Sequence, residues 1–322
     1  MARGGLVSTS GLACGVDVGG TKIAGGVVDA EGRIVEELKV ESPAEDVDAI
    51  EKAIAGLVTE LSSRHDVTCV GVGAAGYVSS TRSHVYFAPN LAWRDIDLKA
   101  ELEQHIDLPV VIENDANAAA WGEFTFGAGK HVDDFLLVTV GTGVGGGIVL
   151  DGKLHRGAFG VAAEIGHMRV VPGGVMCGCG NRGCLESYGS GTALVRATRE
   201  AADGRSLLAR DLIDRAGGDP AAIDGPLITA AAQDGDPFAV DQFSDLGTWL
   251  GEGIASLAAV LDPATVAIGG GVSEAGDLLL GPIRTAFTRQ LTGRGHRPVA
   301  DIVLAELGNK AGLIGAADLA RR

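Results

Sequence analysis

A strand–hairpin–strand pattern occurs twice in this chain of 322 residues, and it restricts the possible folds more than any other feature. Residues 16–33 and 138–153 each contain an apolar run, a hairpin rich in Gly and Thr, a second apolar run and a turn with an acidic residue and Gly. A chain of this length exceeds the usual size of one core. The sequence therefore predicts two domains of similar construction, each beginning with a Gly-rich hairpin.

Periodic apolar residues predict the elements that follow each copy of the pattern. After the first copy we expect strands at 33–40, 67–72 and 108–112 and helices at 45–63, 98–106 and 116–126. After the second copy we expect helices at 184–202, 206–216, 226–234, 237–261, 275–291 and 311–320 and strands at 265–268 and 302–304. Because strands and helices alternate, the fold class is α/β.

Composition argues against several functions. The formal net charge is −16 and there is no cluster of Lys and Arg, whereas a nucleic-acid-binding protein carries a basic patch. No apolar stretch approaches the length that crosses a membrane, and residues 1–11 lack the apolar core of a secretory signal. Cys14 and Cys69 lie in apolar runs and should pack in the core. We therefore expect a cytoplasmic protein without nucleic-acid or membrane partners.

A metal site is the most specific local signal in the chain. Cys177, Cys179 and Cys184 lie within eight residues, with His167 a short distance upstream. One histidine and three cysteines at such spacing form the tetrahedral ligand set of a structural zinc ion. The odd number of cysteines argues against a disulfide framework. Two glutamates flank the set, where they can recognise hydroxyl groups or be ordinary surface charges: Glu164 and Glu186.

Three Gly-rich turns follow apolar strands and can bind a nucleotide. The first, Asp-Val-Gly-Gly-Thr-Lys at residues 17–22, offers bare backbone amides, a hydroxyl and a cation to an anion. By itself it is equally well explained as a plain hairpin, and the repeat of Gly-Thr-Gly at residues 141–143 favours a pair of phosphate-binding turns. Gly269, Gly270 and Gly271 suit an adenine ring, or else form a tight strand-to-helix turn.

The segment Glu113-Asn114-Asp115 lies where a strand is expected to become a helix. An Asp at a helix start is usually an N-cap. The functional alternative is a general base that removes a proton from a hydroxyl group as it attacks a γ-phosphate. Asn114 can donate and accept hydrogen bonds, as recognition of a sugar hydroxyl requires.

Together these motifs resemble those of the ROK family of bacterial sugar kinases and related repressors. The matching motifs lie at residues 17–22, 113–118, 141–147, 164–167 and 177–186. The similarity extends from about residue 11 to the C-terminus and is strongest to the bacterial kinases that phosphorylate glucose with ATP. It implies a two-domain actin/hexokinase-like fold, a duplicated ribonuclease H-like fold with an interdomain cleft. It also implies a small domain of residues 1–115 plus 309–322 and a large domain of 116–308 with the zinc site and a dimer surface.

The resemblance further implies a role for each candidate residue. Asp115 is the expected general base on the sugar 6-hydroxyl, and Asp17 is expected near Mg²⁺. The expected ligands of the sugar hydroxyls are Asn114, Asp115, Glu164, His167 and Glu186. The expected contacts of ATP are Gly19, Gly20, Thr21, Lys22, Thr142, Gly143, Gly270 and Gly271. The expected zinc ligands are His167, Cys177, Cys179 and Cys184.

These roles predict ATP-dependent conversion of glucose to glucose 6-phosphate and ADP, and the resemblance to the family implies a homodimer or homotetramer. Two alternatives stay open. The sugar can be another hexose, such as N-acetylmannosamine, N-acetylglucosamine or fructose, because related kinases share most of the polar set. A sugar-sensing regulator without catalysis is the other alternative, and the family's repressors carry a helix-turn-helix ahead of the first motif. About sixteen residues precede Asp17, and they are not basic-helical, so we do not expect DNA binding.

Overall fold

The computed structural model describes residues 11–204 and 207–322, and contacts divide the chain into two compact units. The first unit comprises Met1–Leu137, Gly146–Ala163 and Ala305–Arg322, and the second comprises Val138–Gly145 and Glu164–Leu304. The predicted boundary at residues 115 and 116 stays a prediction, whereas contacts assign residues up to Leu137 to the first unit. Apart from Gly11, the expected N-terminal arm lies outside the described residues.

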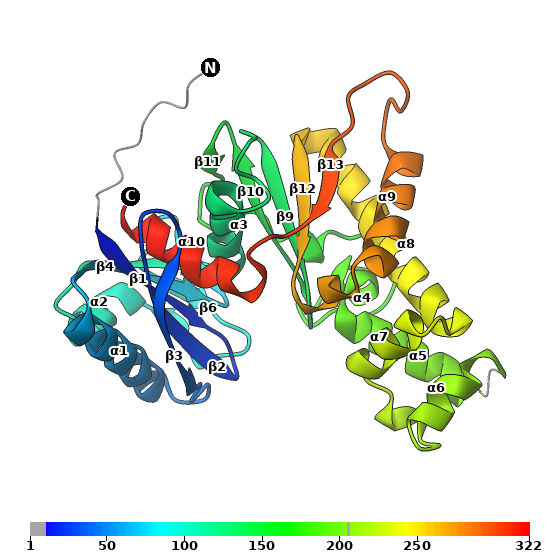
Figure 1. Ribbon diagram of the computed structural model, residues 1–322, viewed down its shortest axis with the longest axis horizontal. Coiled ribbons are helices and arrows are strands. Elements are labelled where there is room, and N and C mark those ends of the chain that lie inside the picture. Colours follow the sequence, from blue (N-terminus) through cyan, green and yellow to red (C-terminus); the bar gives the residue numbers. More distant parts are fainter. Residues whose placement is uncertain (1–10, 205–206) are drawn as a thin grey trace. The chain divides into compact units, whose positions relative to one another are not determined.

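A five-stranded sheet forms the centre of the first unit (Figure 1). Its order is β3-β2-β1-β4-β8, in which β1, β2 and β3 form the predicted antiparallel meander and β4 and β8 add parallel strands. The strands are β1 (Leu12–Val18), β2 (Lys22–Val28), β3 (Ile34–Glu41), β4 (Val67–Ala74) and β8 (Val110–Asn114). Because parallel strands end at the same edge, β1, β4 and β8 place their carboxyl ends together.

Helices cover both faces of this sheet because its strands alternate side chains between two cores. Helix α1 (Val47–Arg64) buries Ile50, Ile54 and Leu61 in one core, in which Cys14 also lies. The other core contains Cys69 and residues of α10 (Ala311–Ala320). Both cysteines are less than 9% exposed, so their expected packing role is confirmed, and burial raises the pKa of Cys14 to about 12.

Helix α10 lies directly on the sheet, and two glycines permit the approach. A Cβ atom added to Gly15 would lie 2.0 Å from the Leu313 carbonyl oxygen, and one added to Gly71 would lie 1.9 Å from that of Ala316. The C-terminal Arg321 continues this contact by donating to the carbonyl oxygens of Gly11 and Val28. The last residues of the chain therefore complete the core of its first unit.

Helix α3 (Asp115–Phe126) carries a fully buried carboxylate, Glu123. Its oxygens accept hydrogen bonds from the backbone amides of Ala128 (3.1 Å), Glu306 (3.0 Å) and Leu307 (2.6 Å). Trp121 on the same helix donates to Asp318 of α10 at 2.8 Å. These contacts explain why α3 belongs to the first unit by contacts, although we expected it to begin the large domain.

A small antiparallel sheet in the first unit was not predicted. Its strands are β5 (Tyr77–Val78), β6 (Val85–Phe87) and β7 (Arg94–Ile96). The short helix α2 (Leu98–Glu103) follows it. Strands of two or three residues carry too little alternation to be recognised in a sequence.

The second sheet has the order β11-β10-β9-β12-β13. Its strands are β9 (Phe135–Val140), β10 (Val144–Leu150), β11 (Lys153–Leu154), β12 (Thr265–Gly269) and β13 (Asp301–Leu304). Strands β9 and β10 are the second copy of the repeated pattern, and β12 and β13 pair in parallel. The helices of the second unit are α4 (Glu186–Gly189), α5 (Gly191–Asp203), α6 (Arg210–Arg215), α7 (Gly225–Gln233), α8 (Pro237–Leu261) and α9 (Asp277–Gln290).

One helix prediction in this unit was wrong. We expected a continuous helix over residues 184–202, but Ser190 separates α4 from α5. Its hydroxyl accepts a hydrogen bond from the Ala193 amide at 3.1 Å, so it caps a new helix. The expected helix at 206–216 has its first residue outside the described part of the chain, and a 3₁₀ turn (Leu207–Ala209) precedes α6.

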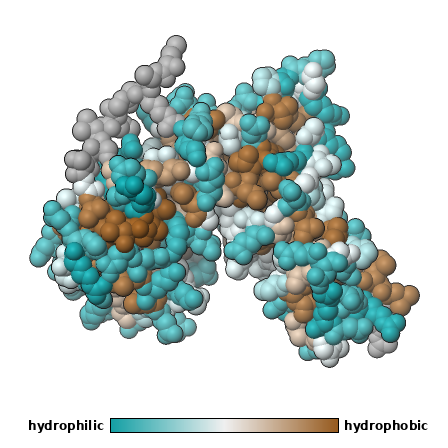
Figure 2. Space-filling view, in the orientation of Figure 1, coloured by the Kyte–Doolittle hydropathy of each residue, from teal (hydrophilic) through white to brown (hydrophobic). Residues whose placement is uncertain are grey.

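Hydrophilic side chains dominate much of the surface of each unit, with hydrophobic ones gathered in patches (Figure 2). Large hydrophobic side chains that stay exposed include Phe159, Leu207 and Val260. Among the described residues, none of the helices combines the length and the apolar character that crossing a membrane requires.

Candidate active site

The first hairpin joins β1 to β2 and presents exposed polar groups. The Gly19 amide donates to the Lys22 carbonyl oxygen at 3.0 Å, which closes the turn. The side chains of Thr21 and Lys22 are exposed, as is Gly20. Amides, a hydroxyl and an ammonium group in one turn are suited to an anion such as phosphate. The structure therefore places the predicted phosphate-binding residues of this unit in one turn.

Asp17 lies near the end of β1, just before this hairpin. Burial raises the pKa of its carboxyl group, because the charged form loses hydration. Helix α10 approaches it at Gly312, where an added Cβ atom would lie 3.5 Å from Asp17 Cγ. A divalent cation nearby would offset the cost of burying this charge, so the residue fits a position beside magnesium.

Asn114 and Asp115 lie where β8 passes into α3, and the structure separates their roles. Asn114 is the N-cap, and its Oδ1 accepts the Asn117 amide at 2.9 Å. Its Nδ2 donates to the Gly76 carbonyl oxygen and to Asp115 Oδ1, both at 3.1 Å. Asp115 is therefore not the capping residue that a simple N-cap interpretation predicts. Its carboxylate lies in the first turn of α3, oriented by the Asn114 amide.

The second hairpin, between β9 and β10, is surrounded by the chain of its own unit. The Gly141 amide donates to the Gly143 carbonyl oxygen at 2.9 Å. Oε2 of Glu186 accepts the Val144 amide at 3.0 Å, and a Cβ atom added to Gly143 would lie 2.2 Å from that oxygen. The Thr142 carbonyl oxygen accepts the Thr192 hydroxyl at 2.7 Å. A side chain at position 143 would therefore collide with the Glu186 carboxylate, so this position requires glycine.

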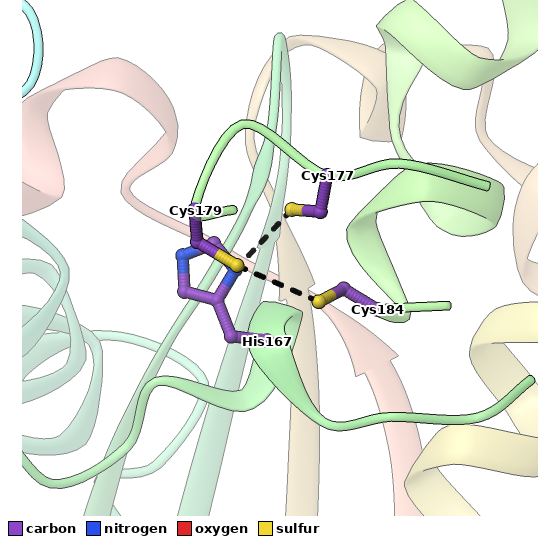
Figure 3. Close-up of side chains that lie close together, drawn as sticks. All are labelled: His167, Cys177, Cys179 and Cys184. Carbon is purple, nitrogen blue, oxygen red and sulfur yellow. Dashed lines mark hydrogen bonds between the residues drawn. The ribbon is translucent and has the colours of Figure 1, made fainter. Parts of the chain in front are cut away.

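The predicted metal ligands converge at one point (Figure 3). The ligand atoms of His167, Cys177, Cys179 and Cys184 all lie within 4.8 Å of one another. The Cys179 and Cys184 sulfurs are 3.7 Å apart, as are the Cys177 sulfur and His167 Nδ1. Ligands bound tetrahedrally to zinc at about 2.0–2.3 Å lie roughly 3.3–3.8 Å from each other. Burial and the neighbouring sulfurs raise the pKa of Cys184 to about 12. The crowded thiols therefore fit a bound cation.

The two nitrogens of His167 face different groups. Nδ1 is on the side of the sulfurs, whereas Nε2 lies 4.0 Å from a carboxylate oxygen of Glu164. Burial raises the pKa of Glu164, with a further rise from Glu186, while His167 acts in the opposite direction. Glu186 Oε1 also lies 3.7 Å from the Cys177 sulfur. The structure thus brings Glu164, His167 and Glu186 together around the cysteine cluster, and their expected contact with a sugar stays a prediction.

The third Gly-rich turn follows β12. Gly270 has φ of +83°, and an added Cβ atom would lie 2.5 Å from the Val140 carbonyl oxygen. The turn therefore requires glycine for its own geometry, as the tight-turn interpretation predicts. Among the described residues, no atom comes within 4 Å of a Cβ atom added to Gly271, which leaves open space beside that backbone.

Comparisons with known proteins agree with these motifs. A sequence model of the ROK family matches residues 13–322. A glucokinase from Streptomyces coelicolor is 53% identical over 97% of this chain and 98% of that protein. A glucokinase from Halalkalibacterium halodurans is 40% identical over 94% and 92% of the two chains. The crystal structure of a ROK family glucokinase from Streptomyces griseus in complex with glucose and AMPPNP matches with a TM-score of 0.87 at 54% identity, covering 97% of this chain and 99% of that one.

Proposed function

Because the chain belongs to the ROK family, whose sugar kinases have the actin/hexokinase-like fold, we propose that it transfers the γ-phosphate of ATP to the 6-hydroxyl of glucose. The proposal is supported by glucokinases that are 53% and 40% identical over nearly the whole chain. The related crystal structure contains both glucose and an ATP analogue. The products are glucose 6-phosphate and ADP.

The observation that carries the mechanism is the placement of Asp115. It lies at the carboxyl end of a parallel strand, where α/β proteins bind their ligands. Asn114 takes the capping role and donates to the Asp115 carboxylate, which is thereby oriented without being the cap. Asp115 accepts the proton of the 6-hydroxyl as that oxygen attacks the γ-phosphorus, and the bond from phosphorus to the ADP oxygen breaks.

The two hairpins supply the groups that face the phosphates. Lys22 and the Gly20 amide are suited to the negative charge that develops during transfer, and the Gly19 amide closes the turn that presents them. In the second unit, Thr142 and Gly143 are proposed to contact the phosphates of ATP, and Gly270 and Gly271 are proposed to contact its adenosine. Mg²⁺ would neutralise the phosphates when bound, with Asp17 beside it.

Zinc is proposed as the metal of the Cys3His cluster. Four protein ligands complete a tetrahedron, so the ion would have a structural role. His167 Nδ1 would bind the metal from the side of the sulfurs, and Nε2 would then carry the ring proton and could donate it to a sugar hydroxyl. Glu164 and Glu186 can accept from neighbouring hydroxyl groups. The metal would thereby hold one wall of the sugar site.

The proposal is tested by Asp115→Asn, which keeps the shape of the side chain and removes the base. We expect turnover to fall by about 10²–10⁴-fold while glucose binding persists. A coupled ADP assay measures turnover, and calorimetry measures binding. Asp48→Asn is the matched control, because Asp48 lies in the first turn of α1, and it should leave turnover unchanged. Near-normal turnover of Asp115→Asn would exclude Asp115 as the base.

The same assay with a panel of sugars tests the substrate. We expect the highest kcat/KM for glucose, ahead of N-acetylmannosamine, N-acetylglucosamine and fructose. Glucose binding without ADP release would instead identify a sugar-sensing regulator. A cytoplasmic location is proposed as well, because the cluster needs reduced cysteines and the reaction needs ATP. A homodimer or homotetramer is the proposed assembly, and analytical ultracentrifugation would measure it.

A further inference from the structure

A buried carboxylate, Glu113, immediately precedes the proposed base segment. Glu113 is only 3% exposed and lies in β8, paired with Gly73 of β4. A charge in such a position is stable only when every side of it is paired or hydrogen-bonded. Its partners therefore indicate which parts of the chain it holds in place.

The Glu113 carboxylate links a distant arginine to the segment that carries Asp115. Arg156 Nε donates to Oε2 at 2.7 Å, and Arg156 Nη2 forms an ion pair with the same oxygen at 2.7 Å. Oε1 accepts from the backbone amide of Asn114 at 3.2 Å and from Asn117 Nδ2 at 3.3 Å. The side chain of Asn114 in turn donates through Nδ2 to Asp115 Oδ1 at 3.1 Å. A continuous chain of contacts thus runs from the guanidinium group to the proposed base.

The loop of residues 155–163 holds Arg156 in a fixed place. The Ala162 amide donates to the Arg156 carbonyl oxygen at 3.1 Å, and the Ser80 amide donates to that of Phe159 at 3.1 Å. Gly160 has φ of +94°, and an added Cβ atom would lie 2.2 Å from the Val78 carbonyl oxygen. The loop is therefore seated closely against the segment around β5 in the first unit.

A second arginine, Arg82, lies near Glu113 but forms no hydrogen bond with it. Arg82 Nε lies 3.8 Å from Glu113 Oε2, beyond hydrogen-bond distance, and Arg82 Nη2 donates to the Leu319 carbonyl oxygen at 2.7 Å. Among the described residues Arg82 Nε has no hydrogen-bond partner.

We propose that Arg156 is a positioning residue for phosphoryl transfer, acting through Glu113 to hold Asn114 and Asp115 in their reactive orientation. The proposal rests on the proposed function, because it assigns Asp115 as the base. Displacement of a catalytic group by about 1 Å can cost on the order of 100-fold in rate. The shape of the guanidinium group matters as well as its charge, because Nε and Nη2 of Arg156 both lie 2.7 Å from Glu113 Oε2.

The test compares Arg156→Lys, which keeps the charge, with Arg156→Ala. We expect kcat to fall by roughly 10–100-fold in both, with glucose KM changed by less than about threefold. Added guanidinium ion should restore part of the turnover of Arg156→Ala. The matched control is Arg33→Lys, since Arg33 Nε also donates to a carboxylate at 2.7 Å, in an exposed pair with Asp29. Wild-type turnover in Arg156→Lys would overturn the proposal.

Amide hydrogen exchange, followed by NMR, separates this proposal from the proposed function. In Arg156→Lys the backbone amide hydrogen of Asn114 should exchange at least about tenfold faster than in the wild-type protein, while the backbone amides of β1 keep their protection. Unchanged exchange at Asn114 would overturn the positioning role even in an active kinase. A wild-type protein that phosphorylates no hexose would overturn the proposed function, and the exchange result would still decide whether Arg156 orders this segment.

Discussion

The two Gly-Thr hairpins arise from the same sequence pattern but are used differently. In the first, Gly20, Thr21 and Lys22 are exposed, and the turn closes through its own backbone. In the second, the Glu186 carboxylate fills the space beside Gly143 and takes the Val144 amide. Thr192 also bonds to the carbonyl oxygen of Thr142. The first hairpin therefore exposes its own polar groups, whereas the second is hydrogen-bonded to the segment that follows the Cys3His cluster.

The two copies also differ in the charged side chains that they contain. Position 17 is an aspartate in the first copy, and the equivalent position 139 is a threonine in the second. Only the first copy has a lysine in the hairpin. The second copy gains its carboxylate from Glu186, which also contacts Cys177. A change in the Cys3His cluster should therefore alter the conformation of the second hairpin, through Glu186, and leave that of the first hairpin unchanged.

The largest expected effect comes from removal of a cysteine ligand. Cys184→Ala should lose the bound metal and lower turnover by on the order of 100-fold or more, because His167 and Glu186 lose their anchor. Metal analysis and the ADP assay measure both losses. Cys69→Ala, a buried cysteine of the first unit, serves as the control and should keep the metal. Full activity without metal would show that the cluster does not order the second hairpin.

A smaller effect is expected when the second hairpin alone is changed. Gly143→Ala places a methyl group 2.2 Å from the Glu186 carboxylate, so the carboxylate must move. We expect kcat/KM for glucose to fall by about 10–100-fold with the metal retained. Gly141→Ala is the matched control within the described structure, because no atom lies within 4 Å of its added Cβ atom. Equal effects of the two changes would contradict the link between Glu186 and this hairpin.

The smallest effect concerns stability and the first hairpin. Burial raises the pKa of Asp17 above its unfolded value, so the folded state is destabilised as pH rises and the group ionises. Asp17→Asn should therefore raise Tm at pH 7 by a few °C, on the order of 2–4 °C, without ligand. The gain should shrink as pH falls toward the ordinary Asp pKa of about 3.9. Calorimetry at several pH values measures it.

Thr139→Ala at the equivalent position of the second hairpin is the control. It removes no ionisable group, so its effect on Tm should not vary with pH. A Tm difference for Asp17→Asn that grows at low pH would contradict the assigned direction. Stabilisation of the wild-type protein by Mg-ATP should be lost in Asp17→Asn if the carboxylate lies beside the cation.

Features that repeat or cluster in the sequence could be predicted from it. The meander of β1, β2 and β3, the helix α8 and the final helix α10 were confirmed because their apolar periodicity is long. The cluster of His167, Cys177, Cys179 and Cys184 could be predicted because three of its members occur within eight residues, and its metal stays a prediction. Local spacing carries enough information for such features.

Features that depend on pairing between distant residues could not be predicted. Asn and Asp are equally good caps, so the sequence did not show that Asn114 caps α3 and leaves Asp115 in its first turn. Glu113 and Arg156 are 43 residues apart, and a single arginine in a loop gives no local signal. The contact of Glu186 with Val144 likewise depends on tertiary packing. What escaped prediction was the set of contacts that orient the candidate groups.

The position of α10 on the first sheet has a consequence for biosynthesis. The backbone of this helix approaches Gly15 and Gly71 closely, yet its own residues are made after every strand of the sheet that it covers. At about 5–20 residues per second, the segment from residue 138 to residue 304 takes roughly ten to thirty seconds to synthesise. During that interval one apolar face of the sheet that contains β1 and β4 stays uncovered, so this face should be open to other apolar surfaces until α10 has been synthesised.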